Sequence, residues 1–294
     1  MTPAVSFVRE RVLPVLAVVA ALLVVWHVFV VVLNMPFERD QAARAGVSPG
    51  LAEIVPRTFA QARPVLPAPH QIVAELWETT IDKAVTSKRS LVYHAAVTLS
   101  VTVAGFVIGS LLGVALAAAM VHSRVLDRSL MPWVIASQTV PIIAIAPMVI
   151  VVLNAVGISG LLPKAMISAY LSFFPVAVGT AKGLRSADGL LLDLMRTYDA
   201  GRAEVFRKLR WPSALPYVFA SLKVAVAAAL VGAIVSELPT GAVAGLGARL
   251  LSGSYYGQTV QIWAALVMTA ILGAALVALV GLAHAAVFRR MEGR

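Results

Sequence analysis

Six long apolar runs restrict what this chain can fold into more than any other feature of its sequence. Each is close to the length of roughly 20 residues that a helix needs to cross the hydrocarbon core of a bilayer. Of the 294 residues 60% are hydrophobic and 13% are charged, whereas soluble domains are nearer to half apolar and a quarter charged. We therefore expect an all-α membrane protein with six transmembrane helices. The runs cover residues 13–33, 94–121, 130–153, 160–181, 215–236 and 260–287.

The placement of lysine and arginine indicates how these spans are oriented. If the N-terminus is cytoplasmic, 14 of the 24 Lys and Arg residues fall in inside segments and 8 in outside segments, almost all of these in one long loop at 34–93. Cytoplasmic loops retain basic residues, and long loops count little in this rule. We expect both termini in the cytoplasm, and the first run is retained because it is too long for a signal peptide. The net charge of +10 is then explained by basic residues in cytoplasmic loops beside anionic lipid. No nucleic-acid partner is expected.

The outer loop divides into two parts. Residues 34–69 contain six of the 16 prolines, so we expect irregular structure there. From 70 to 87 apolar residues recur at helical spacing, which predicts an amphipathic helix at the outer membrane interface. This helix could take part in gating or simply pack on the outer surface of the protein, and the second interpretation is the simpler one.

Small residues recur at every fourth position of the second run. Gly105, Gly109, Gly113 and Ala117 share one stripe of the predicted helix. Such a stripe allows another helix to approach closely within lipid. The partner could be a second subunit or a helix of the same chain, and we favour the second.

A proline in the third run lies beside polar side chains. Gln138 and Thr139 precede Pro141 by less than one turn. Proline removes a backbone hydrogen bond and bends a helix, and carbonyls freed within a membrane must face protein or water. Ser236 and Glu237 are polar residues at the outer end of the fifth run. We predict that these four side chains line the path of a small polar solute.

The segment 183–216 is too polar to span a membrane and too regular to be disordered. Its apolar residues predict two short helices on the cytoplasmic side. Asp199 lies between them and is expected to cap the second helix through the backbone amide of Gly201 or Arg202. Pro212 is expected to begin the next segment, since proline suits the first turn of a helix.

This segment resembles, in register, the cytoplasmic motif of permeases of bacterial binding-protein-dependent ABC importers. The motif reads E-A-A, three residues, G, nine residues, then I-x-L-P. Asp193 stands at its glutamate, Leu194 and Met195 at its alanines, and Asp199 at its glycine, while Leu209, Trp211 and Pro212 close it. Only the proline is identical. Aspartate in place of glycine adds a charge where an ATPase would dock.

Other stretches resemble the branch that imports nitrate, sulfonates, taurine, and thiamine or riboflavin precursors. They are residues 66–69, 138–141, 198–217 and 245–247. The resemblance covers about 65–290, which suggests a division into 1–64, an N-terminal span with an irregular outer loop, and 65–294, the transmembrane domain. It implies a type I ABC importer permease with an outer amphipathic helix and a cytoplasmic coupling helix. The tract 252–259 resembles permeases for pyrimidine-like heterocycles.

The resemblance also implies a set of partners. A separate ATPase subunit would bind ATP and dock on the coupling loop, an extracytoplasmic binding protein would deliver the solute, and a second copy or a related permease would complete the pore in the bacterial inner membrane. No cofactor is expected on this chain. Phe206 is either an anchor for the ATPase or a residue packed on the chain's own helices. The expected coupling residues are Asp199, Ala200, Gly201, Arg202, Ala203, Phe206 and Pro212.

Other classes of membrane protein fit the sequence less well. No P-loop motif is present, so ATP binding by this chain is not expected. The spans contain no convergent acids, bases or metal ligands, and no catalytic or metal-binding residue is predicted. The alternative is an ion-coupled secondary carrier, which would be expected to show internal repeats. No clear repeat is visible in the sequence.

Overall fold

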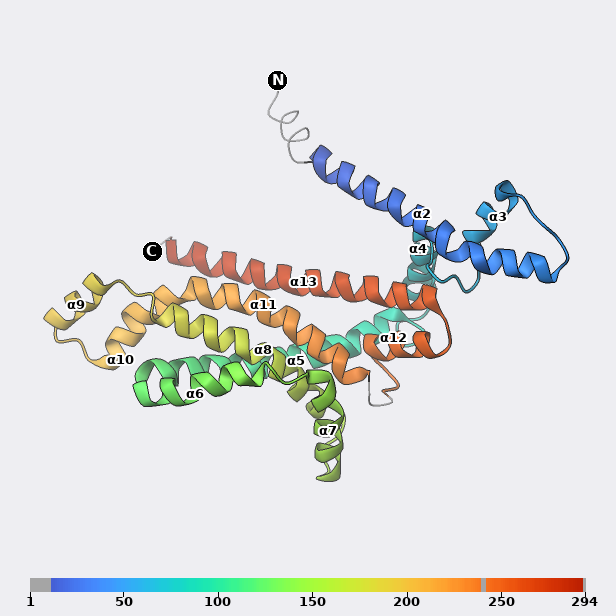
Figure 1. Ribbon diagram of the computed structural model, residues 1–294. Helices are drawn as coiled ribbons and strands as arrows, with labels where there is room; N and C mark the ends of the chain where they lie inside the picture. Colours follow the sequence, from blue (N-terminus) through green and yellow to red (C-terminus); the bar gives the residue numbers. More distant parts are fainter. Residues whose placement is uncertain (1–11, 239–241, 293–294) are drawn as a thin grey trace, which may run out of the picture. The chain divides into compact units, whose positions relative to one another are not determined.

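The computed structural model describes residues 12–238 and 242–292, and all regular elements in these ranges are helices (Figure 1). The expectation of an all-α membrane protein is therefore confirmed. Both termini, which we expect in the cytoplasm, lie outside the described residues. The chain separates into two compact units, one made of Met1–Lys83 and Ser252–Ala265 and the other of Ala84–Leu251 and Leu266–Arg294. Each unit is described by itself.

Five helices in the described part of the chain are long and apolar enough to cross a membrane. The third predicted span is instead a pair, α6 (Arg124–Ser137) and α7 (Ile142–Ala155), bent by 100° at the break between them. Counting this pair as one span gives the six that the apolar runs predict. The five single helices are α2 (Leu13–Arg44), α5 (Leu91–His122), α8 (Leu161–Leu184), the continuous helix Arg202–Glu237 and α13 (Thr259–Glu292).

The first unit contains more helix than we expected from its prolines. The prediction of irregular structure over 34–69 is wrong in two places, because α2 continues through Pro36 to Arg44 and α3 covers Leu51–Thr58. Buried polar side chains hold the connecting loop against α2. Asn34 Oδ1 accepts from the Val65 amide at 2.8 Å, and Gln61 Nε2 donates to Glu38 Oε1 at 2.7 Å. These long-range bonds stabilise a shape that local proline rules do not predict.

The predicted outer amphipathic helix is present but shorter than expected. It consists of α4 (Pro69–Trp77) and a π-helical turn at Glu78–Asp82. Ile72 is buried, whereas Val73, Trp77 and Ile81 are exposed. A helix that leaves large apolar side chains uncovered suits the interface between membrane and water.

The second unit is built around α8, which packs against α5 on one side and α11 (Trp211–Glu237) on the other. The glycine stripe of α5 makes the first contact possible. A Cβ atom on Gly109 would lie 2.8 Å from the Ala169 carbonyl, and one on Gly113 would lie 2.7 Å from the Phe173 carbonyl. The interpretation of the stripe as packing within the chain is therefore confirmed.

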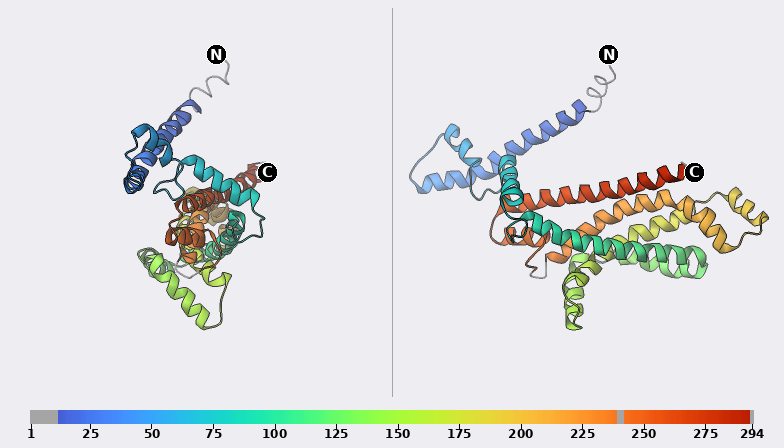
Figure 2. Two further views of the ribbon diagram at one scale, coloured as in Figure 1. Left: turned by 90° about the vertical axis from the view of Figure 1, so that its right-hand side faces the viewer. Right: turned by 180° about the vertical axis from the view of Figure 1, so that it is seen from behind.

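The break in the third span has a local cause. Pro141 has no N–H to offer the carbonyl of Ser137 four residues earlier, and the Tyr170 hydroxyl of α8 donates to that carbonyl instead. α7 then leaves the direction of α6 steeply, as Figure 2 shows. Ala146 and Ile150 of α7 pack on Ile167 of α8. The freed backbone group is thus satisfied by a side chain, as a membrane setting requires.

Candidate functional site

The cytoplasmic loop begins with α9 (Gly189–Thr197), whose two ends are both capped. Asp188 Oδ1 accepts from the Leu190 amide at 2.9 Å at the start. At the end, the Asp199 amide donates to the Arg196 carbonyl and the Ala200 amide to the Met195 carbonyl, both at 3.0 Å. This pair of bonds ends a helix with one residue in the left-handed conformation. That residue is Asp199, with φ of 48°.

The conformation of Asp199 agrees with its place in the importer motif. Left-handed backbone favours glycine, and aspartate is one of the few other residues that adopt it readily. The motif has glycine at this position. The predicted cap, however, is wrong: Gly201 is the N-cap of the next helix and no side chain caps it. Asp199 ends α9 and does not start the next helix, because its left-handed backbone and its amide bond to the Arg196 carbonyl belong to the end of α9.

The position predicted for Pro212 is confirmed, because Pro212 lies in the first turn of α11. The helical path is nevertheless unbroken from Arg202 to Glu237, so α11 follows the preceding turns directly. The helix passes through a π-helical turn at Phe206–Arg210, where the Trp211 amide donates to the Phe206 carbonyl five residues back. We attribute the continuity to this wider turn. Its backbone hydrogen bonds join residues five apart and not four, and this change of pattern comes just before Pro212, which has no N–H to donate.

The predicted coupling residues differ in exposure. Asp199, Gly201, Arg202 and Ala203 are exposed, whereas Ala200, Phe206 and Pro212 are half-buried. The Phe206 ring lies 5.0 Å from the His122 ring and 6.2 Å from that of Trp211, measured between centroids. The structure therefore favours the interpretation in which Phe206 packs on the chain's own helices.

Sequence reasoning missed the exposed apolar face of α9. No side chain of this helix is buried, and Leu190 and Tyr198 are 79% and 77% exposed. Leu191 and Leu194 are exposed as well. The signal is present in the sequence, since leucine at positions 190 and 194 marks one helical face within an otherwise polar loop. That spacing predicts a helix, but it does not by itself distinguish a contact surface from a face packed on the chain's own core.

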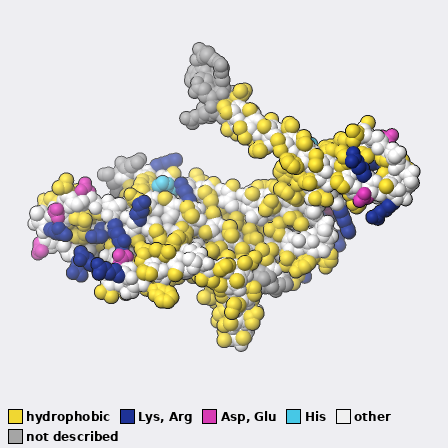
Figure 3. Space-filling view, viewed as in Figure 1, with side chains coloured by type: hydrophobic (Ala, Val, Ile, Leu, Met, Phe, Trp, Pro, Cys, Tyr) yellow, Lys and Arg dark blue, Asp and Glu magenta, His cyan; other side chains and the backbone are white. Residues whose placement is uncertain are grey.

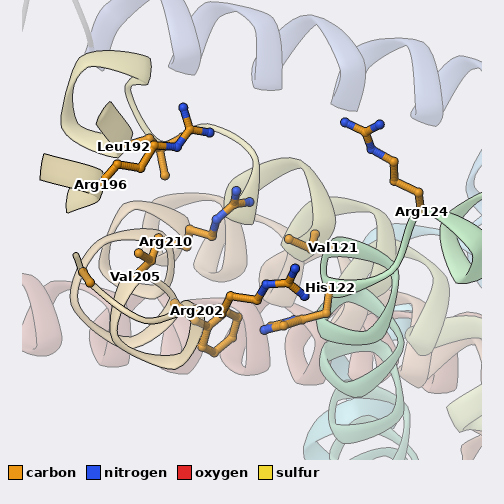
Figure 4. A pocket seen from close by; sticks show the side chains of 10 residues that line it. Val121, His122, Arg124, Leu192, Arg196, Arg202, Val205 and Arg210 are labelled. Carbon is orange, nitrogen blue, oxygen red and sulfur yellow. The ribbon is translucent and has the colours of Figure 1, made fainter. Parts of the chain in front are cut away.

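A basic pocket of about 560 Å³ lies between the end of α5 and this loop (Figure 4). His122 and Arg124 line it from the α5–α6 connection, and Arg196, Arg202 and Arg210 from the loop. Figure 3 shows Lys and Arg gathered over α9 and α10 (Arg202–Val205) at this end of the second unit. The remaining lining residues are Val121, Leu192, Ala200, Val205 and Phe206.

The four predicted path residues lie in two different environments. Gln138 and Thr139 occupy the break between α6 and α7, and both are exposed. Ser236 and Glu237 are fully buried at the end of α11. The exposed pair thus lies at the surface of the described chain, whereas the buried pair forms hydrogen bonds within it.

The Glu237 carboxylate holds a loop at the end of α11. It accepts from the Thr98 hydroxyl at 3.0 Å and from the Gly247 amide at 2.8 Å. The same hydroxyl accepts from the Leu246 amide at 2.8 Å, and His94 Nδ1 accepts from the Gly245 amide at 3.0 Å. Residues 245–247 are thus held by three side chains, His94 and Thr98 of α5 and Glu237 of α11. Within the described ranges, no group of three or more His, Asp or Glu residues could hold a metal ion.

Comparison with known proteins places the chain in a family. Residues 91–293 match the family described as the inner membrane component of binding-protein-dependent transport systems. The chain belongs to this family. It is an ABC importer permease and not an ion-coupled secondary carrier, and such permeases work with an ABC ATPase and a substrate-binding protein.

Several named relatives are similar to this permease over most of its length. A riboflavin transport system permease protein of Chloroflexus aurantiacus is 31% identical over 74% of this chain and 77% of its own. A formylaminopyrimidine transport permease protein of Halalkalibacterium halodurans is 33% identical over 62% of this chain and 68% of its own. A putative aliphatic sulfonates transport permease protein of Bacillus subtilis is 26% identical over 71% and 72%.

Proposed function

We propose that this permease carries a small nitrogen heterocycle of the pyrimidine kind across the bacterial inner membrane. The observation that carries this proposal is its similarity to two relatives named for riboflavin and formylaminopyrimidine transport, at 31% and 33% identity. The exposed side chains of Gln138 and Thr139 suit such a solute: the Gln138 amide offers a donor and an acceptor to ring nitrogens and carbonyls. The Thr139 hydroxyl donates to the Ala136 carbonyl and offers an acceptor.

The solute is tested on the binding protein that delivers to this permease. We expect a formylated aminopyrimidine or riboflavin to bind the purified binding protein at least about 100-fold more tightly than nitrate or an alkanesulfonate, since loss of shaped, paired polar contacts costs several kcal/mol. Isothermal titration calorimetry measures all four. Nitrate or a sulfonate binding as tightly as the heterocycles would refute the assignment of the solute.

The coupling surface that we propose is α9 together with the turn at 199–203. Support comes from the uncovered leucines of α9 and from Tyr198, which follows its last residue; together they make an apolar face in a basic, polar loop. An apolar centre with a charged rim is typical of a protein interface. ATP would be bound and hydrolysed by the partner subunit that docks there. Phe206 and Pro212 would support this surface from behind.

The path that we propose runs past the break between α6 and α7. Gln138 and Thr139 would face the solute, while Ser236 and Glu237 would stabilise the end of α11 and the segment 245–247 behind it. A second permease, identical or related, would close the other side of the pore. The support for this assignment is the combination of exposed polar side chains with a broken helix.

Topology and path can be tested together because the sequence contains no cysteine. We expect Ser48→Cys to react with a membrane-impermeant maleimide from outside and Ser186→Cys only from the cytoplasmic side; both serines are exposed. Thr139→Cys should react with a small aqueous maleimide. Leu279→Cys, at an exposed apolar position of α13, is the matched control and should not react, because lipid covers it.

Two outcomes would contradict these assignments. Labelling of Ser48→Cys and Ser186→Cys from the same side would overturn the orientation. Equal labelling of Thr139→Cys and Leu279→Cys would remove the path from the α6–α7 break, while leaving the family assignment in place.

A further inference from the structure

The basic pocket at the end of α5 carries an excess of positive charge that the protein does not neutralise. Among the described residues, Arg124, Arg202 and Arg210 form no ion pair. Arg210 donates to the Leu184 carbonyl at 3.3 Å, and Arg196 pairs with Asp193 at the exposed rim. No carboxylate lines the pocket. Several guanidinium groups around one cavity repel one another unless an anion enters it.

Two nearby acids are engaged with other bases, and a third, Asp199, lies beside the lining residue Ala200 without lining the pocket itself. Asp127 pairs with Arg185 at 2.6 Å, and Glu204 pairs with Lys208. Neither acid lines the pocket. The lining itself therefore supplies no anion, and an anion from outside the chain would have room to enter.

The lining indicates which kind of anion would bind. Guanidinium forks match the oxygens of a phosphate group in a bidentate manner, and a volume of about 560 Å³ lies within the usual range of small-ligand pockets. The other walls are apolar, from Val121, Leu192, Val205 and Phe206. One wall is the end of α5, a spanning helix, so the pocket lies where that helix leaves the membrane. Anionic lipid head groups gather at that level on the cytoplasmic side.

We propose that this pocket binds a phosphate group, carried either by an anionic lipid or by a free phosphate. His122 and Arg124 approach it from the α5–α6 connection, and Arg202 and Arg210 from the start of the helix that ends at Glu237 (Figure 4). A bound phosphate would join a transmembrane helix to the loop beside the proposed ATPase contact. The pocket would thereby make the stability of that loop depend on the anion.

The test uses the full-length permease purified in detergent, with native mass spectrometry and thermal unfolding as readouts. Short-chain phosphatidylglycerol, short-chain phosphatidylcholine and inorganic phosphate are each titrated. The test variant is Arg202→Gln/Arg210→Gln. The control is Arg128→Gln/Arg207→Gln, which removes the same charge from two exposed arginines outside the pocket.

We expect phosphatidylglycerol to bind the wild type and the control within about two-fold of each other, and the test variant at least about ten-fold more weakly, because charge-assisted bonds are lost only there. Binding of phosphatidylglycerol without inorganic phosphate identifies the lipid as the source. Binding of inorganic phosphate identifies the free anion. Equal losses in test and control variants, or no preference over phosphatidylcholine with no phosphate binding, would overturn the proposal.

A variant that misfolds is recognised by a second readout. The apo form of each variant is checked by size exclusion and by its own melting temperature before titration. Should the double variant be unstable, Arg202→Lys/Arg210→Lys keeps the charge but loses the fork geometry. That variant should bind phosphate more weakly than wild type, and unchanged binding would contradict the bidentate site. The solute carried by the permease does not enter this test.

Discussion

A Gly109→Leu variant is expected to lose the packed transmembrane core, in the largest effect on stability that we predict for a single substitution. Any Cβ atom at this position would lie 2.8 Å from the Ala169 carbonyl and 3.1 Å from the Phe173 amide. Both are backbone atoms of α8, so no side-chain rotation can relieve the clash. Overpacking costs about 1–3 kcal/mol where side chains yield, and we expect more than about 3 kcal/mol here.

The measurement is the melting temperature together with the fraction of monodisperse protein after purification. Gly50→Leu is the control, because a Cβ at Gly50 has nothing within 4 Å and its backbone is extended. This control should behave as wild type. If Gly109→Leu also melts and elutes as wild type, the contact between α5 and α8 is not the one described.

The second large effect is expected at α9. A Leu190→Glu/Leu194→Glu variant should insert normally but lose its ATPase partner during purification, and uptake should fall with it. The two leucines are exposed and four residues apart on one helical face, so charges there would be buried unpaired if the ATPase docks. Interface anchors commonly contribute about 2 kcal/mol or more each, so we expect affinity at least about ten-fold weaker.

Phe206→Ala separates the two surfaces of the loop. Because the ring packs between His122 and Trp211, its loss should lower the melting temperature while the ATPase still co-purifies. The opposite pattern, in which Phe206→Ala releases the ATPase and the α9 variant retains it, would move the contact from α9 to the segment after Gly201. Quantitative pull-down with the ATPase, normalised to inserted permease, measures both variants.

Features that depend on local spacing are predictable from the sequence. The apolar runs mark the spans, and the four-residue period of Gly105, Gly109 and Gly113 predicts a close helix contact. Helical spacing at 190 and 194 likewise predicts α9. In each case the pattern repeats within a few turns, so one sequence contains the whole signal.

Features that depend on distant partners are not predictable in this way. A polar residue that ends an apolar run suggests a place on the solute path for Glu237, but its carboxylate is bonded to Thr98, 139 residues away in the chain. Asn34 and Gln61 similarly hold the connecting loop whose proline content suggests irregular structure. Pro212 lies at a helix start as its usual preference predicts, but no sequence rule indicates the π-helical turn before it. In each of these places, a tertiary contact or a rare local geometry decides the structure, and neither is visible in the local sequence pattern.

The bend in the third span requires that the surroundings of this subunit offer hydrogen-bond partners to the break between α6 and α7. At about 1.5 Å per residue, α6 and α7, with 14 residues each, are about 21 Å long, well short of the roughly 30 Å of a hydrocarbon core. Neither is long enough to cross a bilayer alone, so if the pair forms one span, its junction lies at membrane depth, and Gln138, Thr139 and Val140 are exposed there. Lipid tails offer no hydrogen bonds to such a junction. Its stability in a membrane therefore depends on a neighbouring protein surface or a column of water, and the solute pathway that we propose would supply both.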